Sequence, residues 1–100
     1  MDQVLDLLST MVDGKLNIIG LGLTSLPDSP LWENVVTLYC YNNQLVSLPE
    51  LLNVKYLHCN SNQLASLPKL SNVEYLYCYK NKLTFLPELP QVTNLICSNN

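Results

Sequence analysis

The sequence repeats itself every 19 residues. The segment that begins at Leu38 reads LYCYNNQLVSLP, and it returns as LHCNSNQLASLP from Leu57 and as LYCYKNKLTFLP from Leu76. A fixed period of this length indicates a repeat architecture, in which each unit buries its apolar side chains by stacking on its neighbours. We therefore expect a repeat solenoid that forms one domain.

Each repeat contains one short segment in which inward and outward positions alternate. Along the strand expected at residues 56–60, Leu57 and Cys59 point inward, whereas His58 and Asn60 point outward. Stacking should make these strands parallel on the concave side. Equivalent apolar residues then form ladders through the core: Leu38, Leu57, Leu76 and Leu95; Cys40, Cys59, Cys78 and Cys97; Leu45, Leu64 and Leu83; Leu48, Leu67 and Leu86.

An asparagine follows each expected strand, and a Leu-Pro step follows the asparagine. The side-chain amides of Asn43, Asn62 and Asn81 are suited to bond with backbone groups that the turn leaves unpaired. Proline favours an extended, polyproline-like backbone in the returning segment. Because a 19-residue unit leaves no room for a helix, the convex side is predicted to be extended as well.

The repeat divides the 100 residues into four segments. They are an N-terminal capping helix (residues 1–14), an atypical first repeat (15–34), three 19-residue repeats (35–91) and a partial last repeat (92–100). A solenoid needs a cover with a polar outer side over its first repeat. The first segment is the candidate for that cover.

The capping helix is predicted from apolar residues at helical spacings between residues 2 and 12. Asp2 is placed to cap its first turn, and Gly14 is placed to end it. In the first repeat, the additional residues around 28–34 indicate a turn. Trp32 is expected to pack there, on the convex side near the cap.

The pattern resembles the leucine-rich repeat, whose consensus is LxxLxLxxNxL. Residues 35–45 follow it as VVTLYCYNNQL, and two further copies begin at Val54 and Val73. The sequence LPEL at residues 48–51 and 86–89 is similar to the short "LPX" subclass. That subclass occurs in secreted effectors of bacterial pathogens and looks similar to repeat proteins of large DNA viruses. The resemblance implies the fold and leaves the function open.

The cysteines invite a metal site, but their spacing argues against one. Zinc ligands are typically separated by roughly two to four residues, whereas these four are separated by the repeat length. Stacked repeats would place the sulfurs in a row, with poor geometry for disulfides. We predict a ladder of reduced, buried thiols, which suits a reducing compartment, and we expect no metal or other cofactor.

All six tyrosines fall at outward strand positions. Tyrosine favours strands in general, and neighbouring aromatic rungs stabilise one another. An exposed aromatic patch nevertheless usually marks a partner site. The candidate partner-binding residues are Tyr39, Tyr41, Tyr56, His58, Asn60, Tyr75, Tyr77, Tyr79 and Ile96, and the expected polar rim consists of Asn42, Asn60, Lys80 and Asn94.

Composition narrows the possible functions. The net charge is −3, arginine is absent and the five lysines are scattered, so we expect no nucleic-acid partner. The first residues, Met1-Asp2-Gln3, lack the positive n-region of a signal peptide, so we expect none. The sequence has no apolar run of the ~18 residues that a membrane span needs. We expect a cytoplasmic chain with no membrane partner, in the host cytoplasm if it is viral or a secreted effector. The single histidine has no nucleophile or orienting group beside it in the pattern, so we expect no enzyme.

Two functional hypotheses remain. In the first, the chain is a non-catalytic protein-protein interaction module that binds a partner of unknown identity through the tyrosine-rich concave face. In the alternative, it is a structural protein whose last strand, residues 92–97, pairs with a second copy. Such a homodimer could form through this edge or through the concave face. The repeats could also be part of a longer effector.

Overall fold

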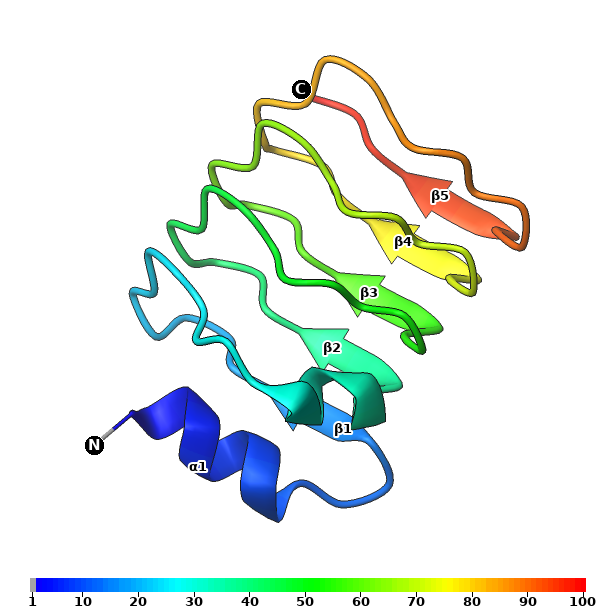
Figure 1. Ribbon diagram of the computed structural model, residues 1–100. Coiled ribbons are helices and arrows are strands. Elements are labelled where there is room, and N and C mark those ends of the chain that lie inside the picture. Colours follow the sequence, from blue (N-terminus) through cyan, green and yellow to red (C-terminus); the bar gives the residue numbers. More distant parts are fainter. Residues whose placement is uncertain (1) are drawn as a thin grey trace.

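A computed structural model describes residues 2–100 as a single stack of chain turns (Figure 1). Each turn contributes one short strand to a five-stranded parallel sheet, ordered β1-β2-β3-β4-β5. The strands are β1 (Lys15–Asn17), β2 (Thr37–Tyr39), β3 (Tyr56–His58), β4 (Tyr75–Tyr77) and β5 (Asn94–Ile96). The molecule measures 34 × 26 × 17 Å. This arrangement confirms the predicted repeat solenoid.

The repeat period sets the register of the sheet. Leu57 of β3 pairs with Leu38 of β2 on one side and with Leu76 of β4 on the other. The first unit is longer, yet Leu16 of β1 still pairs with Leu38. The additional residues of that unit leave the sheet and form a separate 3₁₀ helix. Side chains at equivalent positions therefore stack along the whole length of the solenoid.

The N-terminal helix α1 (Gln3–Thr10) covers the first turn, as predicted. The Asp2 carboxylate oxygen Oδ1 accepts hydrogen bonds from the backbone N–H groups of Val4 at 2.8 Å and Leu5 at 3.3 Å. Val4 and Leu8 are buried in the common core, and the helix contacts β1. Met1, which the predicted capping segment includes, lies outside the described residues. With 8 residues, α1 cannot reach across a bilayer, and no other helix in residues 2–100 can do so.

The predicted end of this helix at Gly14 is wrong. The helix ends at Thr10, and Met11 is already extended. Gly14 instead makes the turn into β1, with φ of +69°. A Cβ there would lie 2.9 Å from Cγ2 of Val36, and the Gly14 carbonyl accepts from two backbone N–H groups of the second turn. The glycine is needed for this close approach rather than for a helix cap.

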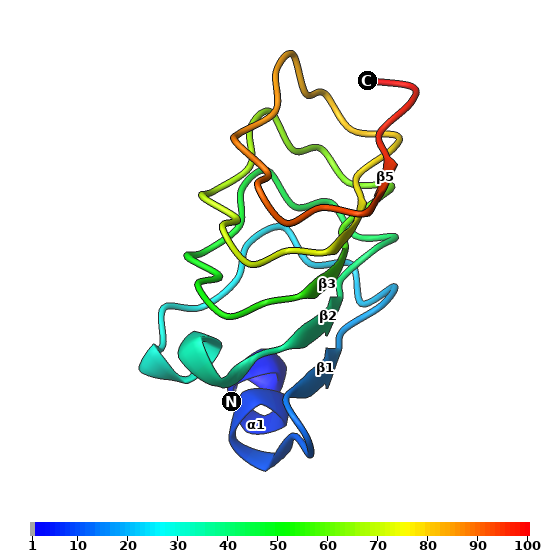
Figure 2. The same cartoon turned by 90° about the vertical axis from the view of Figure 1, so that its right-hand side faces the viewer.

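The turn expected around residues 28–34 is a 3₁₀ helix, η1 (Pro30–Asn34), with Ser29 capping its first turn. Trp32 is 3% exposed, and its indole Nε1 donates to the Pro27 carbonyl at 2.8 Å. The helix η1 contacts α1 and lies on the side of the solenoid opposite the strands (Figure 2). This placement confirms the expected position of Trp32.

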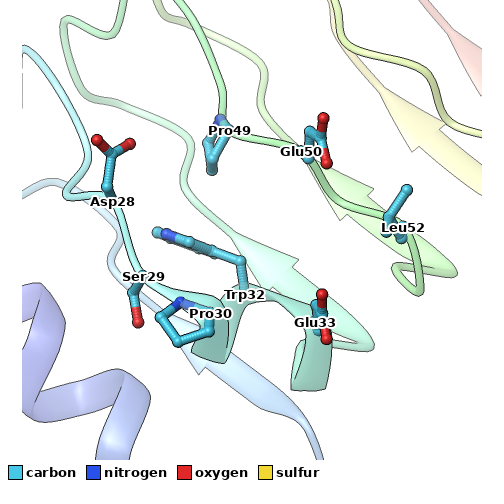
Figure 3. A pocket seen from close by; sticks show the side chains of 8 residues that line it. All are labelled: Asp28, Ser29, Pro30, Trp32, Glu33, Pro49, Glu50 and Leu52. Carbon is cyan, nitrogen blue, oxygen red and sulfur yellow. The ribbon is translucent and has the colours of Figure 1, made fainter.

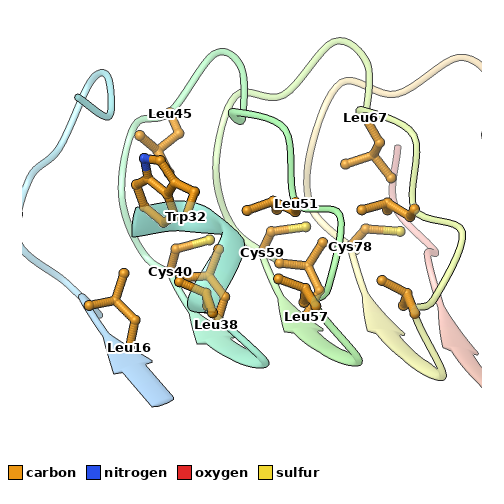
Figure 4. Packing of buried hydrophobic residues seen from close by; sticks show 14 of the residues in the cluster. Leu16, Trp32, Leu38, Cys40, Leu45, Leu51, Leu57, Cys59, Leu67 and Cys78 are labelled. Atoms are coloured by element: carbon orange, nitrogen blue, oxygen red, sulfur yellow. The ribbon is translucent and has the colours of Figure 1, made fainter. Parts of the chain in front are cut away.

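The core follows the predicted leucine and cysteine ladders (Figure 4). Leu38, Leu57 and Leu76 are fully buried, as are the three cysteines that follow them. A further ladder, Leu51 and Leu70, is buried on the returning side without having been predicted. Leu48, Leu86 and Cys97 pack against this core but are only partly buried. The prediction is wrong for Leu95, which is 41% exposed. Leu95 lies on the edge strand β5, so it packs against a neighbouring rung on one side only.

The asparagine ladder confirms the predicted bonds to turn backbone. Asn62 is buried, and its amide Nδ2 donates to the carbonyls of Cys40 at 3.0 Å and Cys59 at 3.1 Å. Its Oδ1 accepts from the N–H of Leu45 at 3.0 Å. Asn43 and Asn81 repeat this pattern, and Asn100 does so as well, although it was not predicted. Each asparagine thus joins its own turn to the preceding one.

The residue before each asparagine adopts the left-handed backbone region. The equivalent residues are Gly20, Asn42, Ser61, Lys80 and Asn99, with φ between 57° and 64°. Here the chain leaves the strand and bends toward the return segment. The five turns bend alike, so the side chains on the open side of the sheet are presented in a regular array.

Candidate functional site

The outward side chains of the sheet form three rows, which we call the sheet face. The first row holds Lys15, Thr37, Tyr56, Tyr75 and Asn94, and the second holds Asn17, Tyr39, His58, Tyr77 and Ile96. The third follows the strand ends and holds Ile19, Tyr41, Asn60, Tyr79 and Ser98. All nine candidate partner-binding residues lie on these rows, whereas Asn42 and Lys80 of the predicted rim follow the third row. The in-register pairing brings them side by side.

His58 lies at the centre of the second row. Its ring centroid is 4.9 Å from that of Tyr39 and 4.5 Å from that of Tyr77, with tilted and edge-on packing. Tyr41 contributes a more distant contact at 6.5 Å. Burial among these rings lowers the pKa of His58 below its ordinary value of 6.5. The imidazole is therefore neutral at pH 7, and its ring nitrogens can donate and accept hydrogen bonds.

Tyr56 and Tyr75 form a second aromatic contact in the first row. Their rings are 5.1 Å apart and nearly perpendicular, at 89°. Edge-to-face packing of this kind is favourable. Tyr75 is 37% exposed, so one face of the pair remains open. In the same row, Thr37 is buried, which the sequence pattern did not indicate.

A hollow of about 500 Å³ lies beyond the carboxyl ends of β2, β3 and β4. Its lining residues are Tyr41, Asn42, His58, Asn60, Ser61, Tyr77, Tyr79 and Lys80. The structure thus brings Tyr41, Tyr77 and Tyr79 together around His58. Ser61 was missed by the sequence analysis. The signal that could have found it is its repeat position, which it shares with Asn42 and Lys80, both predicted at the rim.

Asn60 does not occupy the exposed position that its strand alternation predicted. It is only 7% exposed. Its neighbours in the third row are Tyr41 and Tyr79, whose larger side chains stand on either side of it. The prediction treated each repeat separately and therefore missed this shielding by adjacent rungs. Asn60 lines the floor of the hollow rather than its rim.

Ile96 and Asn94 lie at the margin of the sheet face. Ile96 follows Tyr77 in register on β5 and is 45% exposed. Asn94 is exposed on the same strand, away from the residues that line the hollow. Ile96 therefore extends the second row with an apolar side chain. Asn94 is not part of the polar rim of the hollow, in contrast to Asn42 and Lys80.

The cysteines lie behind the sheet face, in the core. Cys40, Cys59 and Cys78 are buried and free, and Cys97 is partly buried and free. Burial raises the pKa of the Cys40 thiol to about 12. Burial, with Cys97 beside it, raises the pKa of Cys78 to about 12, and burial also raises that of Cys59. These thiols are protonated at pH 7, and a thiol rather than a thiolate is a poor nucleophile or metal ligand. In residues 2–100 no group of three or more His, Cys, Asp or Glu side chains could hold a metal ion.

A second hollow lies on the opposite side of the solenoid, around Trp32. It has a volume of about 310 Å³ and is bounded by η1 and the next return segment (Figure 3). Three carboxylate residues, Asp28, Glu33 and Glu50, line it together with prolines and Leu52. The sequence analysis did not anticipate this hollow. It shows that the acidic residues gather on the returning side.

Comparison with known proteins does not assign the chain to a family. No protein-family model matches the chain, and no curated protein matches it significantly.

Proposed function

We propose that the chain is a leucine-rich-repeat module that binds a protein partner through the sheet face and has no catalytic activity. The observation that carries the proposal is the aromatic array on this face. His58 contacts Tyr39 on one neighbouring strand and Tyr77 on the other, and Tyr56 contacts Tyr75 beside them. Aromatic side chains of this kind supply most binding energy at protein interfaces, because they offer a large contact area with few rotatable bonds.

The rigidity of the array supports the same proposal. Backbone hydrogen bonds between neighbouring turns continue past each strand, for example from the Cys59 N–H to the Tyr77 carbonyl at 2.9 Å. The asparagine ladder fixes the turn that follows. Side chains on such a frame lose little freedom when a partner binds, which lowers the entropic cost of association.

The arrangement of reactive groups favours binding over catalysis. His58 is surrounded by tyrosine rings, and no carboxylate side chain lines its hollow. The cysteines point into the core, where burial keeps them protonated. A catalytic site needs a nucleophile, a base and an orienting group within hydrogen-bond reach. We accordingly propose neither a catalytic residue nor a cofactor.

The proposal is tested by removing aromatic rings without disturbing the frame. The repeat itself supplies tolerated residues, because Asn17 occupies the row of Tyr39 and Thr37 occupies the row of Tyr56. We expect Tyr39→Asn combined with Tyr56→Thr and Tyr77→Asn to abolish capture of a partner from lysate of the source cells or their host. The circular dichroism spectrum should not change.

Phe85 provides the matched control for this experiment. It is 63% exposed and lies on a return segment away from the sheet face. Phe85→Ser removes a comparable exposed ring and should leave capture unchanged. Equal capture by the triple tyrosine variant and the wild type would contradict the proposal.

We further propose a cytoplasmic location, in the host cytoplasm if the chain is viral or a secreted effector. Four free cysteines, three of them buried, support it, because free thiols persist in reducing compartments.

Self-association is a second candidate function, favoured by the exposure of β5. Leu95 is 41% and Ile96 is 45% exposed, whereas the equivalent Leu76 is fully buried. Edge strands with open hydrogen-bonding groups tend to pair with another chain. In this proposal two copies pair through β5 about a two-fold axis. Light scattering should then give twice the monomer mass, and Leu95→Asp should restore the monomer. A monomer at high concentration of the wild type would exclude this candidate.

A further inference from the structure

We infer that the partner presents an acidic polypeptide segment to the sheet face, with a carboxylate side chain seated in the hollow around His58. This inference rests on the proposed binding function and specifies the chemistry of the partner. It starts from the distribution of charge, which is uneven for a chain with a net charge of −3.

No carboxylate lies on the sheet face. The eight acidic residues are Asp2, Asp6, Asp13, Asp28, Glu33, Glu50, Glu74 and Glu88. The first three belong to the cap and its turn, and Asp28, Glu33, Glu50 and Glu88 lie on the returning side. Glu74 directly precedes β4, so it lies at the amino end of the strands, whereas the hollow lies beyond their carboxyl ends. The protein thus keeps negative charge away from the hollow.

The hollow is instead lined by groups that can donate hydrogen bonds. These are the phenol groups of three tyrosines, the His58 ring, the Ser61 hydroxyl, two side-chain amides and the Lys80 ammonium group. A carboxylate offers acceptors only, so it can use several of these donors at once. Hydrogen bonds to an ionised group are also stronger than those between neutral groups. Most of these groups can also accept hydrogen bonds, so the preference for a carboxylate over a neutral or cationic side chain rests on the Lys80 charge and on the lack of carboxylates among the lining residues.

A polypeptide fits the hollow better than a nucleic acid does. Lys80 is the single cationic side chain of the lining, and the chain as a whole is negatively charged. Nucleic-acid sites need several cations along the path of the phosphates. The Tyr56–Tyr75 pair and Ile96 beside the hollow offer apolar contact for the residues that flank the carboxylate. Together these features fit a segment in which acidic and apolar residues are mixed.

A random peptide library displayed on phage, selected on the full chain, tests this inference directly. We expect the selected peptides to be enriched in Asp and Glu relative to the unselected library. A synthetic peptide of the selected consensus should bind about tenfold more tightly than its Asn/Gln counterpart, because one charge-assisted hydrogen bond is lost. Its affinity should also fall as the salt concentration rises.

Two lysine variants locate the carboxylate. Lys80→Asn removes the cation while keeping a residue that the same turn accepts, since Asn42 and Asn99 adopt the same left-handed backbone. It should weaken the consensus peptide about tenfold. Lys69→Glu is the matched control on the returning side, where the equivalent residues are Glu50 and Glu88, and it should change nothing.

The outcomes separate this inference from the proposed function. If the selected peptides are neutral or basic and their binding needs Tyr39 and Tyr77, the inference of an acidic partner is wrong. The proposal that the sheet face binds a partner would still stand. The acidic partner would also be excluded if Lys80→Asn bound the consensus peptide with unchanged affinity, or if the Asn/Gln peptide bound the wild type as tightly as the consensus peptide does. Displacement of the peptide by single-stranded DNA at equal concentration would overturn the choice of a polypeptide. Failure to enrich any peptide, or equal binding by a Tyr39→Asn/Tyr77→Asn variant, would overturn both proposals.

Discussion

Two residues occupy a backbone conformation that their side chains disfavour. Ser61 and Lys80 have φ of 58° and 57°, at the position where the other turns use Gly20, Asn42 and Asn99. The left-handed region costs roughly 1–2 kcal/mol for most residues and less for asparagine or glycine. The fold tolerates this cost because neighbouring turns hold the bend in place.

Ser61→Asn should therefore stabilise the protein by up to about 1 kcal/mol. The measurement is the free energy of unfolding from urea denaturation. Ser66→Asn provides a control, because Ser66 is exposed and has no left-handed backbone to relieve. An equal gain in both variants would show that the backbone conformation is not the cause.

A second effect at the residue scale is that protonation of His58 makes the free energy of unfolding depend on pH. Burial lowers its pKa in the folded chain below 6.5, whereas the unfolded chain titrates near 6.5. Below that pH the unfolded chain takes up a proton that the folded chain resists, so the free energy of unfolding falls as the pH is lowered. The contribution is fully present above pH 6.5 and is lost as the pH falls through the folded-state pKa.

His58→Tyr should remove this dependence, since tyrosine occupies the same row in the neighbouring strands. Urea denaturation of both proteins between pH 7.5 and pH 5 measures it. The difference in free energy of unfolding between variant and wild type should shift in favour of the variant as the pH falls. A difference that stays constant with pH would contradict the assigned cause.

Among the structural elements, the asparagine turn contributes most to the joining of adjacent rungs. Asn62 bonds one backbone N–H, that of Leu45, and three backbone carbonyls, those of Cys40, Cys59 and Asn60. Removing a buried partner leaves these groups without hydrogen bonds and without water. The loss is therefore larger than that of an ordinary surface hydrogen bond.

Asn62→Ala should reduce the free energy of unfolding by about 2–4 kcal/mol. Asn53→Ala is the comparison, because the Asn53 amide is exposed and donates only to the Glu33 carbonyl. That variant should lose less than about 1 kcal/mol. Chemical denaturation of the two variants decides the point, and similar losses would argue against the role assigned to the buried ladder.

The period of the sequence was sufficient to predict the sheet, the leucine and cysteine ladders and the asparagine turn, because each depends on one position repeated along the stack. It could not predict features that depend on how neighbouring rungs differ. Asn60 is buried in the row between Tyr41 and Tyr79, and the turn expected in the first unit takes the form of the 3₁₀ helix η1. The hollow likewise depends on residues from three turns that no single repeat contains.

At the scale of the whole molecule, burial drops at the last described turn of the solenoid. The central positions of the sheet change from fully buried at Leu57 and Leu76 to 41% exposed at Leu95. In a stack of repeats each unit is stabilised by its immediate neighbours. The turn that carries β5 has one neighbour in the described chain, so it is expected to open first.

The cysteine ladder allows this opening to be measured. Cys97 is partly buried, whereas Cys40, Cys59 and Cys78 are buried and have raised pKa values. We expect Ellman's reagent at pH 8 to react rapidly with one thiol in the folded protein and with all four in denaturant. Cys97→Ser should remove the rapid phase. Equally rapid reaction of Cys59 would show that the solenoid does not open from this end.

The asparagine bonds also have a direction. Asn43, Asn62, Asn81 and Asn100 each reach back to the turn before them. Among the described residues, the side chains of Asn43, Asn62 and Asn81 make no bond to the turn after them. A newly made turn therefore brings with it the side chain that completes its predecessor. Synthesis on the ribosome delivers the turns in this same order. The chain can accordingly fold as it emerges, with each turn completed when the asparagine of the next turn docks on it.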